Sequence, residues 1–419
     1  MSLSRRLPFR IFSFLLLIFI ACGFFMAPAA SPVKAQDAAP TPVPTILPPG
    51  EEAAPPAPAA QPAAAPRFKP YTDIVLDYIK MTGRDEGWAI TGQTVLTTVN
   101  AGLTWREASP PEPIPDGATV NTYGAFLDAK TAWIIYAFNG QIKSEAVVWH
   151  TTDGGLTWTP GQPLNHQVFG DKYWAEFTVL DAKNIWLMIR GVFEDVGSNY
   201  DHRLYRSSDG GLTWDYLPSD VSDNYTGMAF SDPGFGLRTQ ESVEPFDGLP
   251  PVYEITLDGG VTWAKRQLPA PPDDLELFNR YAYCETFQPV ALSSESYRML
   301  VGCYDNVTPH QAYEGYFYMT KNDGKTWLFG KLPVKARADS AQLVYFDAKH
   351  IYLLGRDSFQ SSDDGMKWIY LKVVNWDGQF SFVDPQHGWA IARIDKAVSL
   401  VKTTNKAATW KIVSPRIVR

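Results

Sequence analysis

One octapeptide recurs seven times along the chain, and this repeat constrains the fold more than any other feature of the sequence. Its pattern is Ser or Thr first, Asp or Asn third, Gly fifth, Thr seventh and Trp last, and the last three copies match it less closely. Successive Trp residues lie 41 to 64 residues apart. Recurrence at this spacing is typical of folds in which each repeat is one supersecondary unit. The third and last positions are Asn100 and Trp105, Asp153 and Trp158, Asp209 and Trp214, Asp258 and Trp263, Asn322 and Trp327, Asp363 and Trp368, and Asn405 and Trp410.

The residue types of the octapeptide predict a tight hairpin turn. The Asp or Asn oxygen can accept backbone N–H groups two residues further on and so close the turn. The Gly suits a position that needs a positive φ. The Ser/Thr flanks suit strands, and the Trp offers a large apolar surface for packing between neighbouring sheets. We therefore interpret the seven octapeptides as structural turns rather than as sites of chemistry.

Four short strands can be identified around each octapeptide. In the last copy they are residues 379–383, 388–392, 399–402 and 409–413; in the first they are residues 73–78, 87–90, 94–97 and the residues from 105 onward. Seven units of four antiparallel strands predict an all-β fold, a seven-bladed β-propeller in which the octapeptide joins the last two strands of each blade. Both terminal repeats have all four strands, so the sequence does not show which strand closes the ring.

Residues 1–36 have the composition of an export signal. A basic start (Arg5, Arg6, Arg10) precedes an apolar run over residues 11–26, which is shorter than a membrane-spanning helix. Two maturation routes remain open. Small residues before Gln36 permit cleavage after Ala35, whereas residues 19–22 resemble a lipobox in which Cys22 would be lipidated. Either route places the protein outside the cytoplasm, at the cell surface, in the periplasm or in another such space.

Residues 37–66 form an Ala/Pro-rich linker, in which ten of thirty residues are Pro. This composition buries too little apolar surface to offset the entropy of ordering and favours extended polyproline II. At ~3.1 Å per residue the linker reaches up to about 90 Å. We expect it to be disordered and to precede a propeller over residues 67–419.

Two of the three Cys residues fall in the fifth repeat. Cys284 lies in its first strand and Cys303 ends its second, at equal distances from the Ser293-Ser294 turn. Opposite positions in an antiparallel pair have Cβ atoms about 4.5–5.5 Å apart. The sequence thus leaves two alternatives, a disulfide formed in an oxidising compartment or two buried free thiols.

The octapeptide is the Asp-box, or BNR repeat. Together with the recurring Gly-Trp-Ala-Ile strand at residues 87–90 and 388–391, it makes residues 71–414 resemble the photosystem II stability and assembly factor family. The resemblance implies an exported, non-catalytic propeller that binds a protein partner, such as a membrane-protein assembly intermediate. The Asp-box is shared with sialidases and some glucanases, so the alternative is a sialidase-like or other glycoside hydrolase or a carbohydrate-binding protein.

Composition narrows the partners and the chemistry. A formal charge of −8 disfavours nucleic acid and anionic membrane surfaces, so we expect membrane association only through an N-terminal lipid. The six His residues show no metal-ligand spacing, and we expect no cofactor, no metal and a monomer. Residues 67–70 (Arg-Phe-Lys-Pro) do not match the Arg-Ile-Pro signature of sialidases, and we find no catalytic constellation.

Chain direction predicts a binding face. The second strand of each blade ends on the side away from the octapeptides, where four repeats carry an Arg: Arg190, Arg238, Arg356 and Arg393. Guanidinium groups gathered at one rim would suit carboxylate or phosphate recognition. The alternative is solvated arginines paired with neighbouring acids such as Asp357 or Asp395. The longest loops reach the same face, at residues 139–144, 191–202, 239–251 and 305–314, and they carry Phe193, Tyr200, Phe246 and Tyr313.

Overall fold

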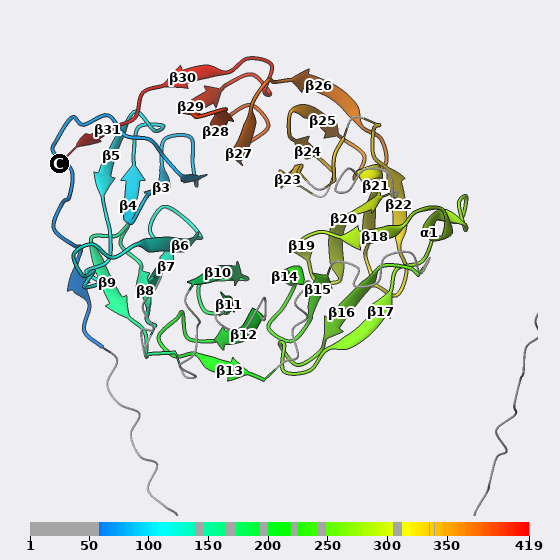
Figure 1. The fold of residues 1–419 in the computed structure, drawn as a ribbon, viewed down its shortest axis with the longest axis horizontal. Coiled ribbons are helices and arrows are strands. Elements are labelled where there is room, and N and C mark those ends of the chain that lie inside the picture. The colour runs from blue at the N-terminus through cyan, green and yellow to red at the C-terminus, as the bar shows by residue number, and fades with distance from the viewer. Residues whose placement is uncertain are drawn as a thin grey trace, which may run out of the picture. The chain divides into compact units, whose positions relative to one another are not determined.

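The computed structural model describes residues 58–138, 146–164, 172–192, 200–218, 225–240, 249–304, 312–334, 336–338, 340–347 and 349–418. The chain divides into Met1–Pro55 and Pro56–Arg419, and the described residues all belong to the second unit. Their strands form seven sheets that succeed one another around a ring (Figure 1). This confirms the all-β, seven-bladed β-propeller.

Each blade is built from consecutive strands, from an inner strand A to an outer strand D. Blades 1 and 2 contain β2 (Tyr78–Met81), β3 (Gly87–Thr91), β4 (Thr94–Thr98) and β5 (Thr104–Glu107), then β6 (Val120–Phe126), β7 (Ala132–Phe138), β8 (Val148–Thr151) and β9 (Thr157–Pro160). Blades 3 and 4 contain β10 (Lys172–Val179), β11 (Ile185–Val192), β12 (Tyr200–Ser207) and β13 (Asp215–Leu217), then β14 (Tyr225–Phe230), β15 (Gly236–Gln240), β16 (Val252–Thr256) and β17 (Ala264–Gln267).

The other three blades follow the same order. In blade 5, strand A is split into β18 (Tyr283–Thr286) and β19 (Val290–Ser293), followed by β20 (Ser296–Tyr304), β21 (Ala312–Thr320) and β22 (Leu328–Lys331). Blades 6 and 7 contain β23 (Gln342–Tyr345), β24 (Ile351–Leu354), β25 (Asp357–Ser361) and β26 (Ile369–Val373), then β27 (Asp377–Phe382), β28 (Gly388–Ile394), β29 (Ala397–Thr403) and β30 (Lys411–Val413). A four-residue helix, α1 (Leu277–Arg280), precedes blade 5.

Each octapeptide forms the turn between strands C and D, closed by its own side chains. In the second copy the Thr151 hydroxyl accepts the N–H of Gly155 (3.1 Å), and Asp153 accepts the N–H and the hydroxyl of Thr157 (3.0 and 2.7 Å). The carboxylate therefore accepts from the residue four positions further along the chain, whereas the sequence predicted two positions. Two successive residues with positive φ, Gly154 and Gly155, lie between the partners. Burial alone would raise the pKa of Asp153, but these hydrogen bonds outweigh it and lower that pKa.

Positive φ is required at the fifth octapeptide position, as predicted. Six copies have Gly there, with φ from 72° to 100°, whereas the seventh has Ala407 with φ 60°. In the third copy the lack of a Cβ also matters for packing. A Cβ on Gly211 would lie 2.9 Å from the Trp133 indole of the preceding blade. Turn geometry and blade packing thus select the same residue.

A backbone hydrogen bond ties every octapeptide to the turn between strands A and B of its own blade. The N–H of the fourth octapeptide residue donates to a carbonyl of that turn in all seven blades, for example Ala101 to Asp85 (2.8 Å) and Lys406 to Gln386 (3.4 Å). Both turns therefore lie at one end of the ring, which we call the octapeptide end. Strands B consequently finish at the opposite end, the loop end.

Strand-B tryptophans connect neighbouring blades. The indole N–H of Trp133, Trp186 and Trp389 donates to the octapeptide of the next blade, at Gly210, Gly259 and Ala101 respectively, over 2.7 to 2.9 Å. All three rings are fully buried. A buried donor without a partner would be costly, so these bonds fix the distance between adjacent blades.

Glutamine side chains connect the inner strands. Gln379 of β27 both accepts from the N–H of Ile79 and donates to its carbonyl (3.0 and 2.9 Å), and Gln342 of β23 does the same for Phe380. Strand A is a free edge of its sheet, with backbone groups that need partners. The amides satisfy these groups where the blades converge.

The ring closes on blade 1, where the C-terminal segment meets the residues that precede strand A. A C-terminal strand, β31 (Arg416–Val418), pairs in parallel with β5, and Asp73 forms a bridge and an ion pair with Arg416. The sequence predicted that strand A covers residues 73–78. Strand A instead starts at Tyr78, and the residues before it belong to this closure.

An N-terminal strand, β1 (Gln61–Pro62), pairs with β9 on the outside of blade 2. Residues 61–66, which composition assigned to the disordered linker, thus belong to the propeller, because β9 and the Ser109 carbonyl provide partners for their backbone.

Cys284 lies opposite Cys303 in the register of β18 and β20, and the two form a disulfide. Both side chains lie in the core between blades 4 and 5. Of the two alternatives, the structure contains the bonded pair.

The closure predicts that Ile417 stabilises the whole ring. Ile417 is 2% exposed and packs with Trp105 and Ile74, so Ile417→Ala should lower the free energy of unfolding by about 2–4 kcal/mol. Urea unfolding followed by Trp fluorescence measures this. The control is Ile412→Ala in β30, where the side chain is 75% exposed and the change should be within about 0.5 kcal/mol. Equal losses in the two variants would contradict the proposed role of β31.

Candidate functional site

Three of the four predicted arginines occupy equivalent places at the loop end, and each reaches the next blade. Arg190 of β11 donates to the Tyr225 carbonyl (2.9 Å). Arg393 of β28 donates to the Asp77 carbonyl (2.8 Å). Arg356 follows β24 and forms two hydrogen bonds with Asp377 (2.7 and 2.6 Å). These arginines therefore hold the start of the neighbouring inner strand, and Arg356 pairs with Asp377 rather than with the adjacent Asp357.

Arg238 does not belong to this set, which corrects the sequence prediction. It stands two residues after Gly236, the first residue of β15, whereas Arg393 stands five residues after the corresponding Gly388. Arg238 is 5% exposed, forms an ion pair with Glu254 and lies 4.4 Å from the centre of the Trp263 ring. It is a buried structural residue within blade 4.

The long loops predicted for this face lie mostly outside the described residues, as do Phe193 and Phe246. Tyr200 is described only as a backbone position, where β11 and β12 extend the hairpin of blade 3 as far as the pair Val192 and Tyr200. Tyr313 lies in β21, again without a described side chain.

A pocket of about 750 Å³ opens at the mouth of the ring, on the loop-end half of the inner strands of blades 1 to 3. Trp174 of β10 lines it and is 46% exposed. Asp77, Asn121, Glu176 and Gln288 supply polar groups. We call this site the ring mouth. Its size and its mixture of aromatic and convergent polar groups are those of a binding site.

A break in strand A of blade 5 places Gln288 in the ring mouth. Pro289 cannot donate to the sheet, and the strand is interrupted between β18 and β19. Gln288 there passes over Gly227, where a Cβ would lie 2.5 Å from the Gln288 side chain. The Gln288 amide then donates to Glu176 (3.3 Å), so side chains from blades 3 and 5 meet beside the Gly227 backbone of blade 4.

Glu176 has the most perturbed carboxyl group of the site. Burial against the inner strands raises its pKa to about 7, although the charge of Arg190 and a hydrogen bond with Tyr225 act in the opposite direction. Burial likewise raises the pKa of Tyr225. A carboxyl group that titrates near neutral pH can both donate and accept a proton there.

Sequence reasoning found Arg190, whose charge acts on Glu176, but missed the lining residues Trp174, Glu176 and Gln288. A signal was present for Gln288, since the Gln-Pro pair interrupts a predicted strand. For Trp174 and Glu176 the signal was the alternation in β10, where both stand on the side opposite to the buried Tyr173 and Ala175. Trp174 is exposed although its neighbours Tyr173 and Ala175 are buried, and an exposed Trp in an inner strand indicates a binding surface.

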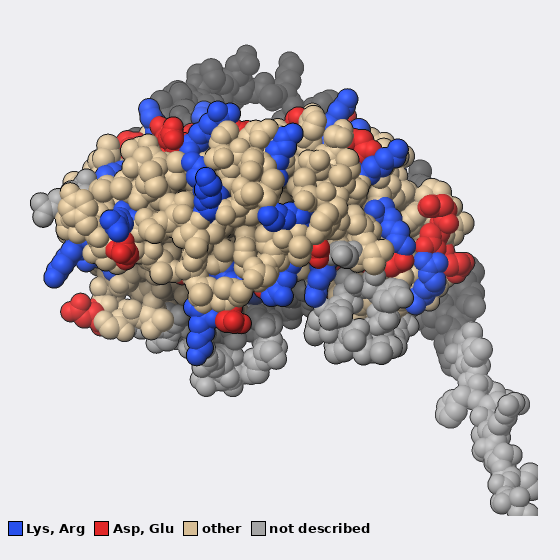
Figure 2. Space-filling model, turned by 90° about the horizontal axis from the view of Figure 1, so that it is seen from above, with Lys and Arg blue, Asp and Glu red and all other residues tan. Residues whose placement is uncertain are grey.

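Other site types find little support in the described part of the chain. No group of three or more His, Cys, Asp and Glu side chains among the described residues could hold a metal ion. None of the described helices is long and apolar enough to cross a membrane. The wall of the disc in Figure 2 carries Lys and Arg side chains spread across it, with Asp and Glu toward its margins.

No family model matches this chain. No curated protein matches it either. The solved structures to which it is similar include YCF48 bound to a D1 peptide, with 18% identity, 82% of this chain and 98% of that chain covered, and a TM-score of 0.49. YCF48 from Cyanidioschyzon merolae has 16% identity, coverage of 82% and 98%, and a TM-score of 0.45.

A puromycin-hydrolysing peptidase from Mycobacterium tuberculosis has 12% identity, coverage of 84% of this chain and 56% of that chain, and a TM-score of 0.51. At such identities the similarities concern the fold alone.

Replacing the buried Arg238 should lower the free energy of unfolding more than replacing the exposed Arg356. Arg238→Ala leaves Glu254 buried and uncompensated, so the free energy of unfolding should fall by about 3–5 kcal/mol. Arg238→Met combined with Glu254→Gln removes both charges and should recover most of this loss. Arg356→Ala removes an exposed pair and should lower the free energy of unfolding only slightly. A large loss in Arg356→Ala would contradict this assignment.

Glu176 predicts a pH-dependent stability. Its folded-state pKa of about 7 exceeds the ordinary value of 4.5, so the ionised form is disfavoured on folding and its cost grows as pH rises from 4.5 through 7. Glu176→Gln should match the wild type at pH 4.5 and be about 2 kcal/mol more stable at pH 8, allowing for partial solvent screening. Urea unfolding at both pH values measures the difference, and a difference that does not change with pH would refute the shifted pKa.

Proposed function

We propose that this protein is an exported, non-catalytic β-propeller that binds a protein partner at the ring mouth. The observation that carries the proposal is the exposed Trp174 beside a pocket with convergent polar groups. Aromatic side chains of this kind are the residues on which protein interfaces most depend. The resemblance of the octapeptide and the Gly-Trp-Ala-Ile strand to assembly factors supports a membrane-protein assembly intermediate as the partner.

The arginines at the loop end already bind groups of the protein itself, which supports the ring mouth, rather than a rim of arginines, as the surface that contacts the partner. Arg190, Arg356 and Arg393 already have partners in the next blade. Recruiting them to a ligand would break contacts between blades. Trp174 has no such competing role, since nearly half of its surface is open to solvent.

The proposal includes export and a tether. The apolar start of the chain and the Ala/Pro-rich composition that follows it support secretion, with either a lipid on Cys22 or cleavage after Ala35. Mass spectrometry of the mature protein distinguishes the two, because a lipidated chain starts at Cys22 and an unlipidated chain at Gln36.

Trp174 should be necessary for partner binding. We expect a photoreactive amino acid at position 174 to crosslink one protein in membrane extracts of the source organism, and the same group at Leu257, on the octapeptide end, to crosslink none. Once that protein is purified, Trp174→Ala should weaken its binding at least tenfold. Tyr370→Ala is the matched control, because Tyr370 is 48% exposed on the outer strand β26 and should not affect affinity. Equal affinities of the three proteins would refute the ring mouth as the contact.

One observation favours a second candidate function, glycoside hydrolysis. Glu176 has a pKa of about 7, as a general acid requires, and Asp77 lines the same pocket. Turnover of a panel of aryl glycosides would then fall at least a hundredfold in Glu176→Gln and persist in Tyr370→Ala. Such a result would replace the non-catalytic function.

A further inference from the structure

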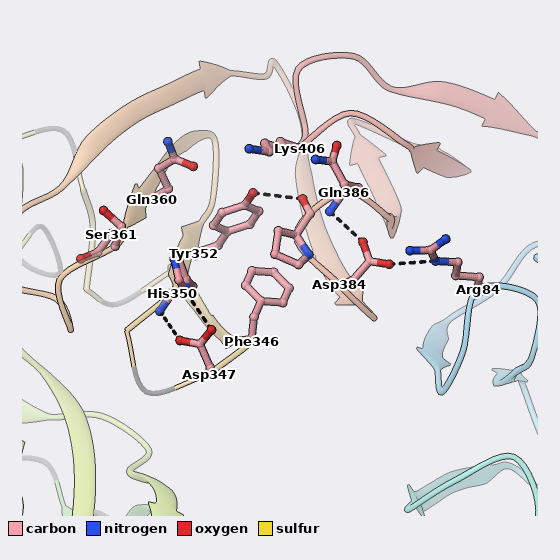
Figure 3. A pocket seen from close by; sticks show the side chains of 12 residues that line it. Arg84, Phe346, Asp347, His350, Tyr352, Gln360, Ser361, Asp384, Gln386 and Lys406 are labelled. Atoms are coloured by element: carbon pink, nitrogen blue, oxygen red, sulfur yellow. Dashed lines mark hydrogen bonds and ion pairs between the residues drawn. The ribbon is translucent and has the colours of Figure 1, made fainter.

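A second pocket, of about 640 Å³, lies at the octapeptide end where blades 6 and 7 meet. Its lining comes from the A–B turns of blades 6, 7 and 1 and from the octapeptides of blades 6 and 7. The rings of Phe346 and Tyr352 lie between the Asp347–His350 pair and Asp384 (Figure 3). The site is therefore separate from the ring mouth, which lies at the other end of the disc.

The two carboxylates of this pocket are already engaged in hydrogen bonds. Asp347 accepts the N–H groups of Lys349 and His350 and the ring nitrogen of His350 (2.7 Å). These bonds lower the pKa of Asp347 to about 2. Asp384 is engaged in the same way by Gln386, His387 and the Nε of Arg84. Burial acts against these bonds, which still lower its pKa to about 2.

Donors, by contrast, remain available. Within the described ranges, the Nζ of Lys406 has no hydrogen-bond or ion-pair partner, and Arg84 uses only its Nε. Both side chains line the pocket. The Nε of Arg84 forms an ion pair with Asp384, so the donors that an anion could meet here are the Lys406 ammonium and the two terminal nitrogens of Arg84.

The floor of the pocket is apolar. Phe346 and Tyr352 are in edge-to-face contact, with ring centres 4.8 Å apart, and the Tyr352 hydroxyl donates to the Pro385 carbonyl (3.0 Å). With its hydroxyl committed, Tyr352 presents only ring carbons to the pocket. A flat apolar body therefore fits the floor, while the cations lie on the rim.

We propose that this pocket binds a small organic anion, namely an aromatic carboxylate whose ring packs on Phe346 and Pro385 and whose carboxylate pairs with Lys406 and Arg84. Benzoate is the probe, benzamide is its neutral isostere, and acetate lacks the ring. Ligand-observed NMR titration of the purified protein measures all three.

Benzoate should bind with a Kd of about 1 mM or tighter, and benzamide and acetate at least tenfold more weakly, since each component contributes about 1.4 kcal/mol or more. Lys406→Met combined with Arg84→Gln should weaken benzoate at least tenfold. Lys396→Met, in the turn between β28 and β29 at the loop end, is the control and should leave the affinity unchanged. The replaced side chains are exposed, so thermal unfolding should be unaltered in all variants.

Four results would overturn the proposal. Equal binding of benzoate and benzamide would remove the role of charge. If acetate binds as tightly as benzoate, the apolar floor has no role in binding. If benzoate does not bind at about 20 mM, or if it binds the double variant as tightly as the wild type, this pocket is not the binding site.

Discussion

The hydrogen-bonded octapeptide turn is the unit on which the rest of the structure depends. Its Ser/Thr hydroxyl and its Asp/Asn oxygen accept N–H groups that the hairpin would otherwise leave without partners. Its fourth residue donates to the A–B turn, and in blades 1, 3 and 4 its carbonyls also accept from strand-B tryptophans of the preceding blade. One turn thus closes a hairpin, joins the two hairpins of a blade and fixes the neighbouring blade. This concentration of roles explains why the motif recurs in all seven blades.

Much of the fold could be predicted from the sequence because these roles depend on local spacing. The Gly, Thr and Trp of each copy are needed within eight residues of one another, so they are visible in the sequence. The ring closure was not predictable in this way. The contacts of Ile417 and Asp73 join residues more than three hundred positions apart, and nothing in either segment specifies the other. Likewise, Gln61 and Pro62 become a strand only because β9 offers a free edge.

The candidate site was harder to predict for a different reason. Arginines at the ends of strands B were found correctly, but their chemistry depends on what the next blade presents. Arg190 meets a carbonyl and Arg356 a carboxylate, and both are thereby committed to structure. Arg238 looks similar in sequence, yet its position in β15 directs it into the core beside Glu254. Trp174 and Glu176 stand on the face of β10 opposite to Tyr173 and Ala175, but alternation alone does not show that this face lines a pocket.

The two ends of the disc are chemically different because of how the blades are joined. At the octapeptide end, backbone donors engage the turn carboxylates Asp347 and Asp384, Arg84 pairs with Asp384 through its Nε, and the Lys406 ammonium remains open among the described residues. At the loop end, Arg190, Arg356 and Arg393 form contacts between blades. Burial there raises the pKa of the Glu176 carboxyl group to about 7. An anion is therefore favoured at the first end, and a partner that supplies hydrogen-bond donors and an apolar surface at the second. The same repeat that builds the ring also divides its two ends between different ligands.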